Sequence, residues 1–467
     1  MDTPEASLFR KRAAEVAEQL ARYIDQGYQG LGPAVSNRPM SDVRGSLQAG
    51  RLLRDGFASD QQFSEFVSAV LSDTTHLHHP GYMGHQVGSV ETATAFGDFI
   101  HGVINNPGSI YEMGPSATVL ETVVLEWMME KIAWCRSKSA GVLTHGGSLA
   151  NLTALLAARG RIAPKAWTEG TPGDLVVIAP ASTHYSVARA VSIIGLGSNQ
   201  VWAASVDQEQ RLLSESVESL IERAKDEGKR VMAVVVNACA TTTGLFDPIA
   251  QVATLCEKHG TWLHVDGCHG ASFLVSEQTR HLLDGIDRAD SVVWDAHKMM
   301  RTSALAAAVL FKDAESFNHA FQQEASYLFY DHERNGVDYL GRAVECTKSP
   351  MGLKTFLALA AGGETNLARY LDSRVALASQ AHQAISQRPG FECPYQPESN
   401  ILCFRAPGSD ADQVAIRDAL LRDGRFHITS AEIHGRRYLR LTFMSASTTP
   451  DTVESLLDWI EQWLIGR

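Results

Sequence analysis

Between residues 123 and 311 the sequence alternates short β-branched and apolar runs with stretches of helical pattern, and this alternation constrains the fold more than any other feature. Strands buried on both faces read as near-continuous apolar runs, and parallel strands need helical crossovers between them. The pattern therefore predicts βαβ units in an α/β domain with a mostly parallel central sheet. Helices are expected over residues 123–132 and 148–159. The expected strands are Leu175–Ile178, Val201–Val206, Val231–Val236, Trp262–Val265, Ser291–Trp294 and Ala306–Phe311.

The two ends of the chain have a different pattern. Apolar residues recur at helical spacing from Phe9 to Ile24, which predicts an amphipathic helix, and the Gly/Pro/Ser/Asn-rich stretch 30–41 interrupts it as a linker. Beyond residue 351 we expect a helix over 353–361, strands over 400–405 and 438–443, and an amphipathic helix over 453–464. The predicted parts are an N-terminal helical segment (1–105), a large domain (106–350) and a small α+β C-terminal domain (351–467).

The composition is that of a folded protein and excludes several classes. A chain of 467 residues is too long for one ordinary core. The formal net charge of -12 argues against a nucleic-acid partner. The seven cysteines include no C-x-x-C pair, so reduced thiols in a cytoplasmic protein are the simplest interpretation. No secretory signal pattern and no uninterrupted apolar stretch long enough for a membrane span is visible.

Lys298 and Asp266 are the first two candidates for chemistry. Lys298 follows the expected strand 291–294, and open α/β sheets bind ligands at the carboxyl ends of their strands. A lysine there can form a Schiff base with a carbonyl cofactor, although a loop lysine is more often simply exposed. Asp266 ends the expected strand 262–265. Its carboxylate could hold a protonated pyridine nitrogen, bind a metal or cap the next helix.

Two further loops complete the candidate site. Gly147 and Ser148 open a helix, where backbone N–H groups and the helix dipole favour an anion, although a plain N-cap would use the same residues. The loop lacks the lysine of a Walker P-loop and the G-x-G-x-x-G pattern. His184 follows the strand 175–178 and could stack on a flat ring or be merely exposed. A phosphate-binding loop, a stacking histidine, a ring-nitrogen carboxylate and a Schiff-base lysine together favour pyridoxal 5'-phosphate.

Several longer stretches carry a family resemblance. They are GVLTHGGSLANLTALLAAR, WLHVDGCHGAS and ADSVVWDAHKMM, with NNPGSIYEMGPSATVLE, TTTGLFDPI and EASYLF as further matches. From about residue 79 onwards the chain resembles the group II pyridoxal-phosphate-dependent amino-acid decarboxylases, which include glutamate, cysteine-sulfinate, aromatic-amino-acid and diaminobutyrate decarboxylases. The resemblance implies a fold-type I enzyme, like aspartate aminotransferase, that works as a homodimer with active sites at the subunit interface.

The resemblance also implies roles for individual residues. Lys298 would carry the cofactor, Asp266 would pair with its ring nitrogen, and His184 would stack on the ring and assist protonation. The implied cofactor-binding set is Gly147, Ser148, His184, Thr241, Asp266, Asp295, His297 and Lys298. The implied substrate-binding set is His85, Gln86 and Arg440.

The implied reaction is decarboxylation of an L-amino acid to the amine and carbon dioxide, through an external aldimine and a carbanion that the cofactor delocalises. In the family a loop tyrosine protonates this carbanion, and Tyr330 and Tyr339 are both candidates here. The alternative is a decarboxylative oxidase (aldehyde synthase) or a carbon–carbon bond-forming enzyme on the same scaffold. A non-catalytic binding module is disfavoured, because it would not need the whole residue set.

Several positions depart from the family pattern and leave the substrate open. Gly267 and His269 stand where alanine and an aromatic residue are common, Thr347-Lys348 replaces a Cys-Gly-Arg-type stretch, and Asp295 stands where acidic-substrate members have asparagine. A small polar or acidic amino acid is expected, resembling glutamate, aspartate, cysteine sulfinate or diaminobutyrate. The histidines of HLHHPGYMGHQVG lack metal-binding spacing, so no metal is expected.

Overall fold

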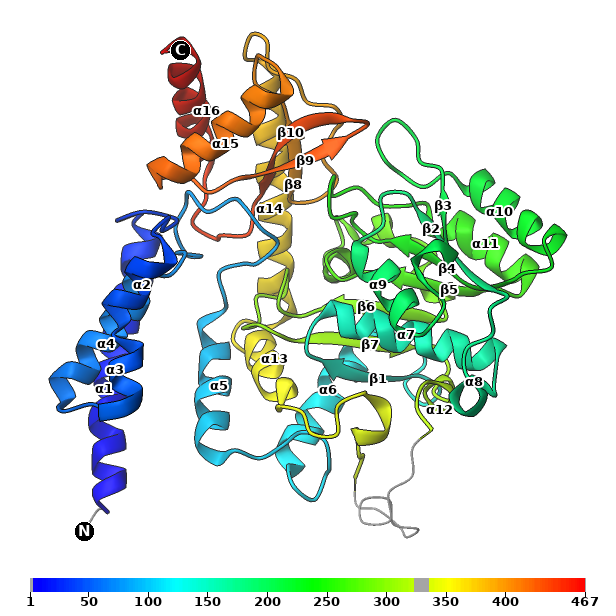
Figure 1. The fold of residues 1–467 in the computed structure, drawn as a ribbon, viewed down its shortest axis with the longest axis horizontal. Coiled ribbons are helices and arrows are strands. Elements are labelled where there is room, and N and C mark those ends of the chain that lie inside the picture. Colours follow the sequence, from blue (N-terminus) through cyan, green and yellow to red (C-terminus); the bar gives the residue numbers. More distant parts are fainter. Residues whose placement is uncertain (1–2, 323–335, 467) are drawn as a thin grey trace. The chain divides into compact units, whose positions relative to one another are not determined.

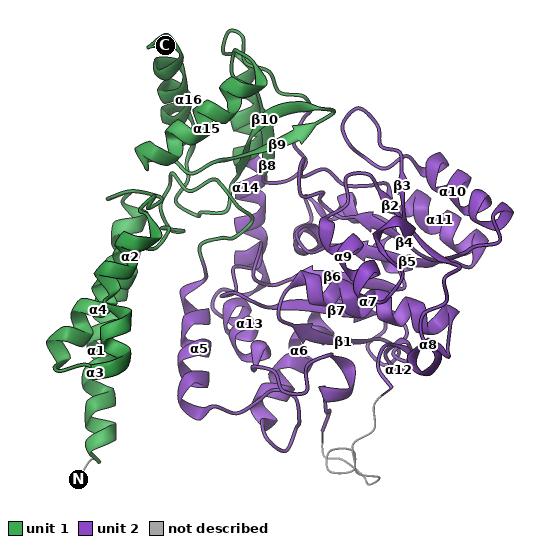
Figure 2. Ribbon diagram, in the orientation of Figure 1, with its two compact units in different colours: residues 1–89, 377–394, 401–467 green, residues 90–376, 395–400 purple. Residues whose placement is uncertain are grey.

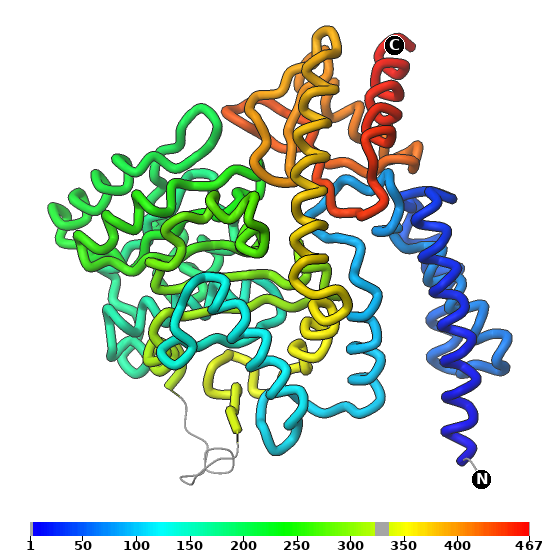
Figure 3. The backbone as a smooth tube through the Cα atoms, turned by 180° about the vertical axis from the view of Figure 1, so that it is seen from behind, coloured from blue at the N-terminus to red at the C-terminus, as the bar shows by residue number. Residues whose placement is uncertain are grey.

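The computed structural model describes residues 3–322 and 336–466, and the chain divides into two compact units (Figure 2). Unit 1 comprises residues 1–89, 377–394 and 401–467, and unit 2 comprises residues 90–376 and 395–400. Helix α14, Gly363–Ser386, contains one of the boundaries and is continuous from end to end (Figure 3). The two units interleave along the chain. They therefore do not test the expected division into three consecutive segments, which stays a prediction.

The central element of unit 2 is one β-sheet (Figure 1). Its strands within the described residues are β1 (Ala140–Thr144), β2 (Leu175–Pro180), β3 (Val201–Ala204), β4 (Arg230–Asn237), β5 (Trp262–Asp266), β6 (Ser291–Asp295) and β7 (Ala307–Phe311). They lie in the order β1-β7-β6-β5-β4-β2-β3. The neighbours from β6 through β3 are parallel, whereas β7 is antiparallel to both β1 and β6. The predicted mostly parallel α/β sheet is therefore confirmed.

The helices of unit 2 pack around this sheet. They are α5 (Thr92–Ile104), α6 (Pro115–Lys131), α7 (Gly147–Ile162), α8 (Ala166–Glu169), α9 (Tyr185–Ile193), α10 (Ser214–Asp226), α11 (Ile249–His259), α12 (Ser316–Ala320) and α13 (Met351–Ala360). Helix α7 packs against strands β4 to β7, and every residue of β2, β5, β6 and β7 is buried. Helix α6 begins earlier than expected, because Pro115 at its first turn presets the helical φ. Across the described part of the chain, no helix has both the length and the apolar character needed to cross a membrane.

Strand β1, at the edge of the sheet, was not expected from the sequence. Its five residues include Gly141, which weakens the strand pattern, yet a Cβ there would lie 2.6 Å from Leu310 Cδ2 on the neighbouring strand. The outer edge is closed by a buried ion pair between Glu121 and Lys348. Leu143 N donates to Glu121 Oε1 (2.9 Å), and Lys348 Nζ donates to Leu143 O (2.9 Å). The ion pair thus provides hydrogen-bond partners for the backbone N–H and C=O of Leu143, which has no neighbouring strand on that side.

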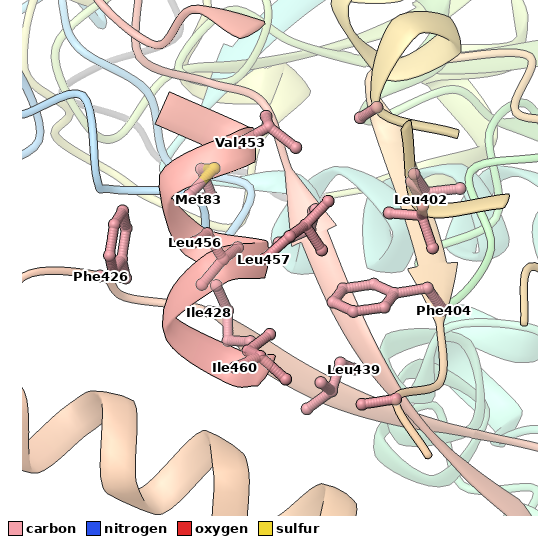
Figure 4. Close-up of a cluster of buried hydrophobic side chains, with 14 of the residues drawn as sticks. Met83, Leu402, Phe404, Phe426, Ile428, Leu439, Val453, Leu456, Leu457 and Ile460 are labelled. Atoms are coloured by element: carbon pink, nitrogen blue, oxygen red, sulfur yellow. The ribbon is translucent and has the colours of Figure 1, made fainter. Parts of the chain in front are cut away.

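Unit 1 combines the N-terminal helices with a small α+β layer. Its elements are α1 (Pro4–Tyr28), α2 (Met40–Leu47), α3 (Ala49–Asp55), α4 (Asp60–Ser72), β8 (Ile401–Phe404), α15 (Asp410–Asp423), β9 (Thr429–Ile433), β10 (Arg436–Thr442) and α16 (Pro450–Ile465). The strands form an antiparallel sheet in the order β8-β10-β9. Figure 4 shows α16 packing its apolar face, including Leu457 and Ile460, toward Phe404 and Leu439 of this sheet. The terminal amphipathic helix was predicted, whereas α15 and the half-exposed edge strand β9 were not.

Candidate active site

A cavity of about 290 Å³ lies in unit 2 at the carboxyl ends of the parallel strands. Every residue of the predicted cofactor-binding set lines it: Gly147, Ser148, His184, Thr241, Asp266, Asp295, His297 and Lys298. These residues end or follow β1, β2, β4, β5 and β6. The fold therefore brings together side chains that are up to about 150 positions apart in sequence, because parallel strands present their carboxyl ends at one edge.

The loop from β1 to α7 depends on two glycines. Gly146 has φ +100°, a conformation that favours glycine, and it is the N-cap of α7. A Cβ at Gly147 would lie 2.4 Å from Cys268 Sγ and 2.9 Å from Asp295 Oδ1, so this position accepts no side chain. The backbone of Gly147 consequently lines the cavity without a side chain. A helix N-terminus at such a place favours the binding of a phosphate group.

Lys298 is surrounded by carboxylates. Its Nζ lies 3.1 Å from Asp295 Oδ2, and His297 Nε2 lies 3.7 Å from the same oxygen. Burial alone would lower the pKa of Lys298, but the negative charges of Asp295 and Asp266 outweigh burial and raise that pKa above its ordinary value. The amine is therefore held charged at the end of β6, where it balances the buried carboxylates.

Asp266 is a buried and ionised carboxylate. Its Oδ2 accepts from Asn151 Nδ2 (3.0 Å) and its Oδ1 accepts from Cys268 N (3.2 Å). Burial would raise the pKa of Asp266, but hydrogen bonds from the side chains of Cys268 and Asn151 and the charge of Lys298 keep that pKa below its ordinary value. A permanent negative charge therefore ends β5 at the cavity wall.

His184 lies at the N-cap of α9 and contributes a neutral imidazole. Its Nδ1 accepts from Ser186 N (3.3 Å) and lies 2.8 Å from Ser186 Oγ. Burial lowers the pKa of His184 below its ordinary value, although the charge of Asp266 opposes this shift. The ring is thus a flat, uncharged surface at pH 7.

These groups fit pyridoxal phosphate. The Lys298 amine can bind its aldehyde carbon, the N-terminus of α7 can hold its phosphate, and Asp266 can pair with a protonated ring nitrogen. The observation that favours this cofactor over a plain anion is the buried, ionised Asp266, since a protonated ring nitrogen can pair with this carboxylate and a plain anion offers it no such partner.

Of the remaining predicted residues, Tyr339 does not line this cavity. Tyr339 is buried beside Lys348, and its hydroxyl lies 2.8 Å from Thr122 Oγ1. Tyr330 lies outside the described residues. His85, Gln86 and Arg440 belong to unit 1.

Sequence reasoning missed several residues of the site. His145, Ser186, Asn237, Cys239 and Cys268 line the cavity together with His269, which was already named from the sequence, and Asn151 supports it from α7. Asn151 could have been found from the sequence, because an amide on the buried face of a helix needs hydrogen-bonding partners. In residues 3–322 and 336–466, no three His, Cys, Asp or Glu side chains are grouped to hold a metal ion.

Comparisons with known proteins agree with this geometry. The family described as "Pyridoxal-dependent decarboxylase conserved domain" matches residues 58–407. An acidic amino acid decarboxylase, GADL1, of Bos taurus is 28% identical over 436 residues, covering 89% of this chain and 83% of its own length. The cysteine sulfinic acid decarboxylase of Homo sapiens is 31% identical over 357 residues, covering 75% of this chain and 72% of its own length.

Solved structures show the same fold. The mouse enzyme CSAD in apo form superposes with a TM-score of 0.89 at 25% identity, over 98% of this chain and 99% of that chain. The glutamate decarboxylase domain of a Vibrio parahaemolyticus diaminobutyrate enzyme superposes with a TM-score of 0.88 at 22% identity, over 100% of this chain and 97% of that chain. The named relatives are decarboxylases, so the alternative of an oxidase or carbon–carbon bond-forming enzyme is not favoured.

Proposed function

Because the chain belongs to the pyridoxal-dependent decarboxylase family, we propose that Lys298, Asp266 and His184 form the centre of its active site and that its substrate is a small acidic L-amino acid. The protein is a carboxy-lyase that uses pyridoxal phosphate. The observation that carries the residue assignment is the meeting of the Lys298 amine and the Asp266 carboxylate in one cavity, at the ends of the adjacent parallel strands β5 and β6.

Each group has a defined task in this proposal. Pyridoxal phosphate supplies, when bound, an electron-withdrawing ring that delocalises the electron pair left by the departing carbon dioxide. Lys298 holds it covalently, and the N-terminus of α7 with Gly147 and Ser148 holds its phosphate. Asp266 keeps the ring nitrogen protonated by opposite-charge pairing. His184 covers one face of the ring, while Thr241, Asp295 and His297 complete the wall.

Asp295 next to a phosphate would be repulsive without compensation. Lys298 Nζ at 3.1 Å from Asp295 Oδ2 is the compensating donor, and His297 Nε2 lies 3.7 Å from the same oxygen. His297 is itself oriented by the contact of its Nδ1 with Ala306 O (2.9 Å). We therefore include Asp295 and His297 as a coupled pair in the cofactor-binding set.

We assign the final proton transfer to Tyr330. Tyr339 is disfavoured, because its hydroxyl contacts Thr122 and its ring packs under the Lys348 amine, inside the body of unit 2. Burial raises the pKa of Tyr339 above its ordinary value, which makes its phenol a weaker proton donor.

The substrate proposal rests on the relatives and on the buried cation Arg440 in unit 1. The named relatives act on acidic amino acids and on cysteine sulfinic acid. His85 and Arg440 lie near each other, and Arg440 Nη1 donates to Gly84 O (3.4 Å). Since a guanidinium is always charged, Arg440 is suited to an anionic substrate group, and its charge acts on the neighbouring His85.

The test of the substrate is a panel of L-amino acids scored for carbon dioxide release by the purified holoenzyme. Aspartate, glutamate, cysteine sulfinate, diaminobutyrate and aromatic amino acids should be compared, with the Lys298→Ala variant as the inactive control. We expect the three acidic substrates to give the highest kcat/KM. A clear preference for diaminobutyrate or an aromatic amino acid would contradict the proposal.

We further propose a homodimer located in the cytoplasm. Phe96, Phe99, Ile100, Val103 and Ile104 on α5 all have exposed side chains, and such an apolar face on one helix is typical of a subunit interface. All seven cysteines are free, which is typical of a reducing compartment.

A further inference from the structure

A continuous line of buried polar side chains lies beneath the cavity, and Asn151 of α7 is at its centre. Its Nδ2 donates to Asp266 Oδ2 (3.0 Å) and to Ser186 Oγ (3.0 Å). Its Oδ1 lies 3.0 Å from His264 Nε2. Asn151 and His264 are fully buried and Ser186 is almost so. Every hydrogen-bonding atom of the Asn151 amide group is thus used inside the protein.

The proton positions on the His264 side follow from elementary rules. An ionised Asp266 only accepts hydrogen bonds, so the NH₂ group of Asn151 must face it and Asn151 Oδ1 must face His264. His264 Nε2 therefore carries a hydrogen. Burial lowers the pKa of His264 to about 4, so its Nδ1 is unprotonated and accepts from Ser291 Oγ (2.8 Å). Ser291 Oγ in turn accepts from Trp262 Nε1 (2.8 Å), which fixes the far end of the line.

The Ser186 side fixes the tautomer of His184. Ser186 Oγ accepts from Asn151, which leaves its own hydrogen free to point at His184 Nδ1, 2.8 Å away. The backbone N–H of Ser186 also donates to that Nδ1 (3.3 Å). Two donors on one nitrogen require an acceptor, so the neutral ring of His184 carries its hydrogen on Nε2.

We propose that Asn151 is a positioning residue that orients Asp266 toward the cofactor ring nitrogen and, through Ser186, imposes the Nε2–H tautomer on His184. One amide group would thereby couple the carboxylate assigned to the ring nitrogen with the imidazole assigned to the ring face. This inference rests on the cofactor roles proposed above for Asp266 and His184.

The first test uses two cofactors to examine the link between Asn151 and Asp266 separately from the link to His184. Apo-protein is titrated with pyridoxal phosphate and with 1-deazapyridoxal phosphate, which lacks the ring nitrogen. For Asn151→Ala we expect the Kd for pyridoxal phosphate to rise about tenfold, equivalent to about 1.4 kcal/mol, and the Kd for the deaza analogue to stay unchanged. Thr153→Val is the matched control, since Thr153 is buried on the same helix but bonds only to Leu149 O. It should bind both cofactors as the wild type does.

The second test addresses the His184 arm in the apo-protein, with Ser186→Ala. Histidine-selective ¹⁵N NMR, assigned with a His184→Gln variant, reports the tautomer and the titration of His184. We expect wild-type His184 to be protonated on Nε2 at pH 7. In Ser186→Ala the loss of one donor to Nδ1 should raise the pH at which His184 takes up a proton by about one unit. This readout needs no bound cofactor.

The outcomes separate this inference from the proposed function. If the wild type binds both cofactors equally well, the role of Asp266 is wrong and the inference falls with it. If the wild type prefers pyridoxal phosphate but Asn151→Ala weakens both cofactors by the same factor, or neither, only the role of Asn151 toward Asp266 is overturned. An unchanged titration of His184 in Ser186→Ala overturns the second arm.

Discussion

Replacing Lys348 with methionine removes one partner of a buried ion pair and leaves the other in place. The side chains of Lys348 and Glu121 are each 1% exposed. Burial raises the pKa of Glu121 above its ordinary value of 4.5, with the charge of Lys348 opposing that rise, and burial likewise lowers the pKa of Lys348. Without the lysine, Glu121 loses its hydrogen-bonded partner charge, with only the smaller influence of Arg342 left, and should fold in its protonated form.

The size of the effect follows from that protonation. Taking up a proton at pH 7 on a group whose unfolded pKa is near 4.5 costs about 3 kcal/mol of folding free energy, and about 1 kcal/mol at pH 5. Leu143 O also loses its donor, which adds about 1–3 kcal/mol at either pH. Because the pKa of Glu121 is raised in the folded variant, the loss of folding stability is small at low pH and grows as the pH rises.

The assay is urea unfolding of the apo-protein, followed by circular dichroism at pH 5 and pH 7. Lys348→Met should be much less stable than the wild type at pH 7 and closer to it at pH 5. The double variant Glu121→Gln/Lys348→Met removes the buried charge and keeps an acceptor for Leu143 N. It should therefore recover the part of the lost folding stability that depends on pH. Lys131→Met, which breaks the exposed pair with Glu364, is the control and should cost under about 1 kcal/mol. A loss that is independent of pH, or a double variant no more stable than the single one, would refute this reasoning.

The remaining predictions concern protonation, the loop tyrosines and assembly. His264 has a folded pKa of about 4 against 6.5 unfolded, so it should remove about 2 kcal/mol of stability between pH 7 and pH 5, and His264→Gln should lessen that slope in urea unfolding. Tyr330→Phe should abolish most amine formation while Tyr339→Phe keeps it, and the reverse result would move the proton donor to Tyr339. Phe99→Glu on α5 should give monomers in analytical ultracentrifugation, whereas dimers of unchanged stability would exclude this face.

Periodicity and strand-end residues predicted the central sheet well, because buried parallel strands leave a strong pattern. The runs ending near Asp266 and Asp295 were recognised as strands, and the ligand-binding edge followed from their direction. Strand β1 was not predicted, because Gly141 interrupts a run of only five residues. The position of this strand is determined by its pairing with β7. Tertiary contacts, not local pattern, determine such short elements.

The site was predictable at the level of individual groups but not of their connections. Lys298, Asp266 and His184 could be named from their places after strands. The link through Asn151 and Ser186 joins residues on α7, β5 and α9, and no local spacing reveals which atoms meet there. The partners of Lys348 likewise come from α6 and β1, far away in sequence.

The most direct test of Lys298 as the cofactor-binding lysine is reduction of the purified holoenzyme with borohydride, followed by digestion and peptide mapping by mass spectrometry. We expect a single pyridoxyl group on Lys298, and none on this peptide in a Lys298→Ala variant that retains its fold. A pyridoxyl group on another lysine, or none on the wild-type protein saturated with the cofactor, would contradict the assignment of the active site.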